Sequence, residues 1–372
     1  MRLSLILALS ALVASAISPL YGTERADHEA RAAEVMESIQ DDFWDRKSGL
    51  YSSKPNGKDP EMIWGSGVMF SAVAGAARHD RKYRSVMRKF FEGMDAYWDV
   101  QVKIPGYEPA RTQGGNDKYY DDNAWMVLTF LEAYEMTGES RYLKRAEETL
   151  EFVVSGWDEE AGGGIWWHER HVNDCKNTCV NAPAALGCFR LARLLKGEEA
   201  ENWNKFGEKI AVWTVKTLQG SNSLFSDAIV VKTGKINYGQ LTYNSGIMLR
   251  VFLSLHARTG ERFYLDEALR MGQAADALLD SNTGVYRDPP KWTHLMVEAD
   301  LELYRVTKNE KFLKRAIRTT DAHYDSWKES PSPNLITQAS LARELWLLVD
   351  HRTEVGRTFW KEADLIPAKS RK

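Results

Sequence analysis

Apolar residues recur three and four positions apart along most of the chain, which is the spacing of an amphipathic α-helix. The sequence therefore predicts an all-α protein. Twelve segments show the pattern: 26–42, 62–78, 82–98, 122–136, 140–154, 180–195, 201–217, 242–257, 261–279, 292–306, 310–327 and 335–349.

A turn motif recurs between pairs of these helices. It combines a Gly or Asn that ends one helix, a charged residue, and an aromatic residue near the start of the next helix. Copies lie at 79–83, 137–143, 195–203, 259–265 and 307–313, and the first four start about sixty residues apart. This period fits a unit of two helices. Six helical hairpins closing into a ring form an (α/α)6 barrel, and an open helical solenoid is the alternative.

Long loops alternate with the short turns. The segments 45–61, 99–121, 156–179, 218–241 and 280–291 are rich in Gly, Asn and Asp. Successive connections between antiparallel helices lie at opposite ends of the ring. Because short turns and long loops alternate along the chain, the long loops should therefore gather at one end. Loops held on a rigid scaffold commonly carry binding and chemistry, so we expect a cleft at that end.

The first residues have the pattern of a secretory signal peptide. Arg2 precedes an apolar run, and small residues at 14–16 form a cleavage site. The run is too short to span a bilayer, and no later segment is longer than a helix-sized apolar run. We expect a signal peptide over 1–16, a single domain over 17–372, and a secreted or periplasmic monomer without a membrane span.

Composition narrows the function. The formal net charge of −3 argues against a nucleic-acid binder, which normally has a basic balance. Thirteen Trp and 15 Tyr would suit either a cleft that stacks on flat ligand faces or an aromatic-rich helical core. The motifs of phosphate-loop, dinucleotide, serine-hydrolase and zinc-protease sites are missing, so we expect neither a cofactor nor a metal.

The three cysteines do not form a disulfide framework. Cys188 has the position of a buried thiol on a helix face. A bridge between Cys175 and Cys179 stays open, since it requires their segment to be a loop.

Two adjacent aspartates, Asp121 and Asp122, stand where an amphipathic helix begins. One aspartate there can cap the helix, and it complements the helix dipole. A second one adds like-charge repulsion, which raises the pKa of one member of the pair. Glycoside hydrolysis needs one ionised and one protonated carboxyl group, and close pairs belong to retaining enzymes. The pair Asp41 and Asp42, late in a helix, has the pattern of ordinary surface.

Further candidates lie in or beside the long loops. Two tryptophans follow three glycines at 162–164, and amides and a phenol precede or open later helices. Each has a plain explanation as a turn or a cap, but all of them fall at the end where a cleft is expected. They are Trp166, Trp167, Asn181, Asp227, Tyr243 and Asn244.

Several motifs together resemble glycoside hydrolase family 76, the endo-α-1,6-mannanases. They follow the family's order over residues 60 to 280: YYDDNAW at 119–125, GGGIWW at 162–167, KNTCVNAPAA at 176–185 and LTYNSG at 241–246. The resemblance implies an (α/α)6 barrel and retaining hydrolysis without a metal. It implies Asp121 as nucleophile and Asp122 as general acid/base. It places sugar contacts at Trp125, Trp166, Trp167, Asn181, Asp227, Tyr243 and Asn244.

Two departures bear on the substrate. A phenylalanine-lysine-glycine motif that many members carry is absent from the stretch 289–305, and Ser245 replaces a usual glutamine. The expected function is a secreted enzyme that cleaves internal α-1,6-mannosidic bonds of mannan. The alternatives are a transglycosylase of the same fold, a non-catalytic glycan-binding barrel, and an epimerase or unsaturated-uronide hydrolase, which would need a different catalytic set.

Overall fold

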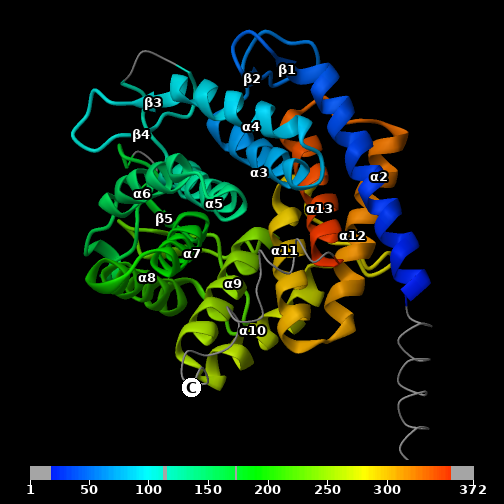
Figure 1. Ribbon diagram of the computed structural model, residues 1–372. Helices are drawn as coiled ribbons and strands as arrows, with labels where there is room; N and C mark the ends of the chain where they lie inside the picture. Colours follow the sequence, from blue (N-terminus) through cyan, green and yellow to red (C-terminus); the bar gives the residue numbers. More distant parts are fainter. Residues whose placement is uncertain (1–17, 112–114, 172–173, 353–372) are drawn as a thin grey trace, which may run out of the picture.

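The computed structural model describes residues 18–111, 115–171 and 174–352, and helices make up most of this part (Figure 1). The predicted signal peptide lies outside the described residues. Six helices line the inside of a ring: α3 (Ile63–His79), α5 (Tyr120–Thr137), α7 (Thr178–Leu194), α9 (Thr242–Thr259), α11 (Pro290–Thr307) and α13 (Leu335–Arg352). Six cover them outside: α2 (Ser18–Phe43), α4 (Lys82–Gly93), α6 (Ser140–Ser155), α8 (Gly197–Leu218), α10 (Arg262–Ala274) and α12 (Glu310–Glu329).

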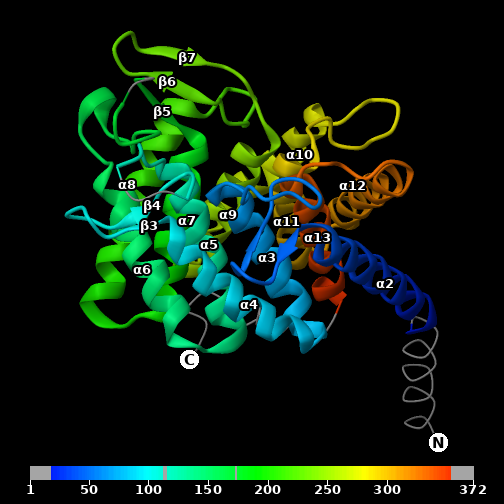
Figure 2. The same ribbon diagram turned by 90° about the horizontal axis from the view of Figure 1, so that it is seen from above.

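The inner helices close on themselves. Each packs against the next, and α13 returns to pack against α3 (Figures 1 and 2). The predicted (α/α)6 barrel is therefore confirmed, and the open solenoid is excluded. Five helix pairs are consecutive hairpins, whereas the sixth pairs α13 with α2, so helices from opposite ends of the described chain seal the ring.

All twelve predicted helices are present, with bounds within a few residues of the expected ones, except that α2 begins earlier. Two of the outer helices are shorter than predicted because they tighten into 3₁₀ turns, Met94–Tyr97 after α4 and Ala275–Leu278 after α10. The outer helices α4 and α12 bury one face only, while the inner helices are buried around most of their circumference.

Close approach between inner helices depends on glycine. A Cβ on Gly67 would lie 2.7 Å from the Met126 sulfur on α5, and a Cβ on Gly75 would lie 2.8 Å from the Trp346 Cβ on α13. Real Cβ atoms are not found so close to such neighbours, and a well-packed core tolerates extra volume poorly. These two glycines let α3 contact both of its neighbours in the ring.

Short antiparallel strands, which the helical pattern did not predict, lie in the long loops. The pairs are β1 (Trp44–Asp45) with β2 (Leu50–Tyr51), and β3 (Trp98–Asp99) with β4 (Gly106–Tyr107). A three-stranded sheet has the order β5 (Cys175–Asn177), β6 (Ala228–Val230), β7 (Lys235–Asn237). Because β5 leads into α7 and β6–β7 precede α9, this sheet ties two cleft-end loops together.

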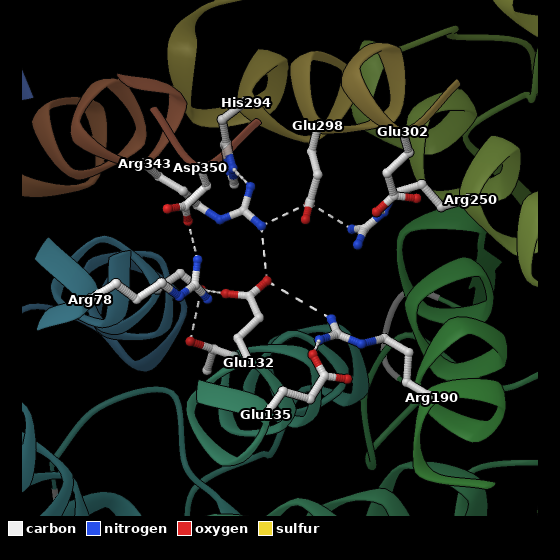
Figure 3. A network of polar contacts seen from close by, with 12 residues as sticks. Arg78, Glu132, Glu135, Arg190, Arg250, His294, Glu298, Glu302, Arg343 and Asp350 are labelled. Atoms are coloured by element: carbon white, nitrogen blue, oxygen red, sulfur yellow. Dashed lines mark hydrogen bonds and ion pairs between the residues drawn. The ribbon is translucent and has the colours of Figure 1, made fainter. Parts of the chain in front are cut away.

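Charged side chains meet at the centre of the ring (Figure 3). Arg343 on α13 donates to Glu132 on α5 at 3.0 Å and to Glu298 on α11 at 2.7 Å. Arg250 on α9 donates to the same Glu298 at 2.6 Å. Arg190 on α7 lies 3.9 Å from Glu132.

The α3 helix joins the same network through Ser71, which donates to Glu132 at 2.7 Å. Arg78 on α3 also pairs with Asp350 on α13. The network thus connects all six inner helices through polar contacts. We had not predicted it from the sequence.

Replacing Arg343, which pairs with both Glu132 and Glu298, should destabilise the ring. Arg343 has a side chain only 3% exposed, so Arg343→Met leaves two buried carboxylates with less compensation. We expect a loss of about 3 kcal/mol or more in the free energy of unfolding, measured by urea denaturation. The matched control is Arg262→Met, which breaks an exposed pair with Asp266 on α10 and should change stability little. Equal effects of the two variants would contradict the assigned role.

Candidate active site

All inner helices begin at the end of the ring that carries the long loops, and a cavity of about 800 Å³ opens there. Since these helices occupy equivalent places in the ring, their second residues lie at equivalent positions. Five of those six residues line the cavity: Trp64, Asp121, Cys179, Tyr243 and Lys291. The cleft is thus built by a repeated helix position as well as by the loops.

Asp121 and Asp122 both line the cleft from the first turn of α5. The Oδ1 atom of Asp121 accepts a hydrogen bond from the backbone N–H of Asp122 at 3.0 Å. Its Oδ2 atom accepts from the Trp167 indole at 2.8 Å and from the Cys179 thiol at 3.4 Å. The start of a helix also favours negative charge. Asp121 is therefore held in a set of donors that suits an ionised carboxylate.

The two carboxyl groups have unequal surroundings. Burial raises the pKa of Asp121, but the hydrogen bonds from Trp167 and Cys179 counteract that rise. Burial raises the pKa of Asp122 well above its ordinary value, and the neighbouring charge of Asp121 raises it further. The pair therefore favours an ionised Asp121 beside a protonated Asp122.

The loop 156–171 holds Trp167 against this pair. The Trp167 carbonyl accepts from the Tyr120 N–H at 2.9 Å, and its own N–H donates to the Cys175 carbonyl at 3.0 Å. The preceding glycines have positive φ, and a Cβ on Gly164 would lie 2.5 Å from the Trp213 ring. These glycines form a tightly packed turn, which explains why the motif needs them.

Of the other predicted sugar contacts, Trp125, Trp167, Asp227 and Tyr243 line the cleft. Trp125 is 4% exposed, and the Arg343 guanidinium lies 5.2 Å from its ring centre. The polar network therefore touches the floor of the cleft. The carboxyl group of Asp227 accepts from the Asn237 amide at 2.8 Å, while burial raises its pKa.

Trp166, Asn181 and Asn244 are not among the residues that line the cavity, so the structure does not place them at the cleft as expected. The Trp166 indole donates to Asp158 at 2.7 Å and stacks on His171, because neighbouring residues of an extended segment point to opposite sides. Trp167 takes the cleft side of the same segment.

The two amides lie behind the cleft wall. Asn181 accepts from the Ile165 N–H at 2.8 Å and donates to the Ile165 carbonyl at 3.1 Å, so it clamps the loop that carries Trp167. Asn244 is fully buried near Asp227, and its amide only partly counteracts the rise that burial causes in the pKa of that carboxyl group. Both residues can support the site without lining it.

The prediction missed several lining residues. The Lys291 ammonium lies 4.8 Å from the Trp292 ring centre and 6.0 Å from that of Trp64. Tyr119, just before α5, packs edge-on against Trp167 at 5.4 Å. The signal that would have found Trp64 and Lys291 is their equivalence to Asp121, the second residue of another inner helix.

Cys175 and Cys179 both line the cleft and are not joined by a disulfide, which answers the open question of a bridge between them. Cys188 is buried within α7, as expected. In the described ranges, no group of three or more His, Cys, Asp or Glu side chains is arranged to hold a metal ion. The helices described here also include none that is both long and apolar enough to cross a membrane.

Known proteins are similar to this chain in sequence. The sequence profile of glycosyl hydrolase family 76 matches residues 27–290. A curated fission yeast protein, the meiotically up-regulated gene 191 protein of Schizosaccharomyces pombe, is 27% identical over 215 residues, which are 54% of this chain and 47% of that protein. This chain thus spans about half the length of that relative.

Solved structures agree on the fold. A family 76 α-mannanase from Bacteroides thetaiotaomicron superposes with a TM-score of 0.80 at 23% identity, over 87% of this chain and 95% of its own. An inactive variant of a Salegentibacter α-1,6-mannanase, with two consecutive aspartates replaced by asparagine and α-1,6-mannotriose bound, gives 0.73 at 22% identity, over 87% and 99%. Dfg5 from Chaetomium thermophilum, in complex with glucosamine, gives 0.70 at 15% identity, over 87% and 90%.

The helix ring with a carboxylate pair in its cleft is an arrangement that glycoside hydrolysis can use. Because the family profile covers most of its length, the chain belongs to glycosyl hydrolase family 76. The resemblance inferred from the sequence motifs is thereby confirmed.

The buried acid should cost stability when it ionises. The pKa of Asp122 is higher in the folded protein than the ordinary value of about 3.9 expected in the unfolded chain. Stability is therefore lost as the pH rises above that ordinary value. We expect Asp122→Asn to raise the melting temperature at pH 8 by roughly 2–4 °C, with a smaller gain at pH 4. The control is Asp41→Asn, because Asp41 is exposed on α2. A gain in melting temperature that does not depend on pH would contradict the prediction.

The glycine turn offers a matched pair of variants. Gly162 and Gly164 both have positive φ, but only Gly164 faces a neighbour, the Trp213 ring. Gly162→Ala should lower the free energy of unfolding by about 1–2 kcal/mol through backbone strain alone. Gly164→Ala should lower the free energy of unfolding further, because the added methyl group would meet the Trp213 ring. It should also lower turnover, because it displaces the loop that carries Trp167. Urea denaturation and activity measured together check this, and equal costs would refute the close packing.

Proposed function

We propose that the protein is an endo-acting α-1,6-mannanase that hydrolyses mannan with retention of the anomeric configuration. The observation that carries the proposal is the adjacent pair Asp121 and Asp122 in an open cleft, with surroundings that favour one ionised and one protonated carboxyl group. This is the charge arrangement that double displacement requires.

In the first step, a carboxylate oxygen of Asp121 attacks the anomeric carbon, and the bond to the leaving oxygen breaks. Asp122 gives its proton to that oxygen, so the leaving chain departs as an alcohol. In the second step, the Asp122 carboxylate takes a proton from water. The water oxygen attacks the anomeric carbon and displaces Asp121, which regenerates both groups in their starting states.

The cleft suits a polymer. Its lining includes the rings of Trp64, Tyr119, Trp167, Tyr243 and Trp292, whose faces can stack on successive sugar units. The α-1,6 specificity is supported by the Salegentibacter relative, which binds α-1,6-mannotriose as an inactive variant lacking two consecutive aspartates. The predicted signal peptide at 1–16 supports export of the enzyme.

Debranched α-1,6-mannan is the substrate that tests this proposal. Purified protein should yield a ladder of short manno-oligosaccharides, and proton NMR should show the α anomer as the first product. Products longer than the substrate at high acceptor concentration would indicate a transglycosylase in place of a hydrolase. Binding without products would favour a glycan-binding barrel. An initial β product would refute the retaining mechanism.

Replacing either aspartate of the cleft tests whether the pair carries out the reaction. Asp121→Asn and Asp122→Asn should each lower kcat on mannan by about 10³-fold or more, with circular dichroism unchanged. Asp41→Asn is the matched control, because Asp41 also belongs to an adjacent aspartate pair but is exposed on α2. Full activity in either cleft variant would refute the assigned site.

A further inference from the structure

Three side chains lie next to one another across the floor of the cleft. They are Tyr243 on α9, Cys179 on α7 and Asp121 on α5, each the second residue of its helix. The Cys179 sulfur lies 3.4 Å from Oδ2 of Asp121, and the Tyr243 side chain lies near enough to the same sulfur to interact with it. Since α5, α7 and α9 are consecutive in the ring, the contacts cross two neighbouring helix interfaces.

The direction of the hydrogen bond between Cys179 and Asp121 follows from the protons available. An ionised carboxylate can only accept, so the thiol must donate to Asp121. Burial and the nearby charges of Asp121 and Asp227 raise the pKa of Cys179 well above its usual range, which keeps the proton on sulfur. Burial likewise raises the pKa of Tyr243, so its hydroxyl stays protonated beside the sulfur.

The other groups around Asp121 do not replace the thiol. Asp122 on the same helix is the protonated member of the pair, and none of the hydrogen bonds seen in the described residues joins its carboxyl group to that of Asp121. Asp227 beside β6 is an acid, so its charge would oppose that of Asp121. Tyr119 and Tyr243 reach Asp121 through charge interactions, and no hydrogen bond from either hydroxyl to its carboxyl group is seen in the described residues. The side-chain donors to Asp121 in this part of the chain are the Trp167 indole and the Cys179 thiol.

We propose that Cys179 is a positioning residue for the nucleophile: its S–H donates to Asp121, fixes the rotation of that carboxylate and favours its ionised form. The inference rests on the proposed function, in which Asp121 attacks the sugar. Trp167 approaches Asp121 from the loop and Cys179 from the neighbouring helix, so each holds the carboxylate from a different side.

Direct titration of Asp121 tests this without any substrate. Carbon-13 NMR of aspartate-labelled full-length protein follows the carboxyl signal, which is assigned by its loss in Asp121→Asn. In Cys179→Ala the pKa of Asp121 should rise, because a donor to its charged form is gone. In Cys179→Ser a hydroxyl donor remains, so the value should stay near that of the wild type. Cys175→Ala, a second thiol lost from the same cleft, should leave it unchanged.

Kinetics on mannan provide the second measurement. The acid limb of the kcat/KM profile reports ionisation of the nucleophile in the free enzyme. Cys179→Ala should move that limb to higher pH and lose about three- to tenfold in kcat/KM below it, with a smaller loss on the plateau. A merely structural role would lower the whole profile without moving the limb.

The outcomes separate the two proposals. An Asp121 titration that is identical in the wild type and in folded Cys179→Ala overturns the positioning role. The same holds if Cys179→Ser shifts as far as Cys179→Ala. A titration that shifts as expected in a protein without activity on mannan supports the positioning role and overturns the proposed substrate.

Discussion

Six inner helices can form this ring only because the charged side chains they bury meet one another at its centre. Arg343, Glu132 and Glu298 take part in a network that connects every inner helix (Figure 3). Burying these charges costs desolvation energy, and only mutual pairing offsets that cost. Each helix therefore has one rotation and one height at which its charge is compensated. We interpret the network as a device that sets helix register more than as a source of stability.

Helix register in turn determines the cleft. Because the inner helices are held at matching heights, the second residue of one helix reaches that of the next, as Cys179 reaches Asp121. The two adjacent carboxyl groups then have different surroundings. Hydrogen-bond donors counteract the rise in the pKa of Asp121, whereas burial and the charge of Asp121 both raise the pKa of Asp122. The asymmetry that the proposed chemistry needs arises from where two neighbouring helix ends and one loop meet.

The helical period and the turn motifs were enough to predict the α-helices of the described residues and the ring, because a buried stripe repeats in each element. The aspartate pair was also visible, since two carboxyl groups exceed what a helix start needs. Which of Trp166 and Trp167 faces the cleft was not predictable, because it depends on the path of the glycine turn before them, where φ is positive. The contacts of Asn181 behind the cleft wall and the charge network could not be predicted either. The sequence around a polar residue in a buried helix does not show which distant residue it will contact.

Trapping of the glycosyl-enzyme tests the central claim most directly. An α-mannosyl fluoride has a leaving group that needs little acid assistance, so Asp122→Asn should form the covalent intermediate but break it down slowly. Intact-protein mass spectrometry should then show one added mannosyl residue, and peptide mapping should place it on Asp121. An adduct on another residue, or release of the β product without any adduct, would contradict the assignment of Asp121 as nucleophile and Asp122 as acid.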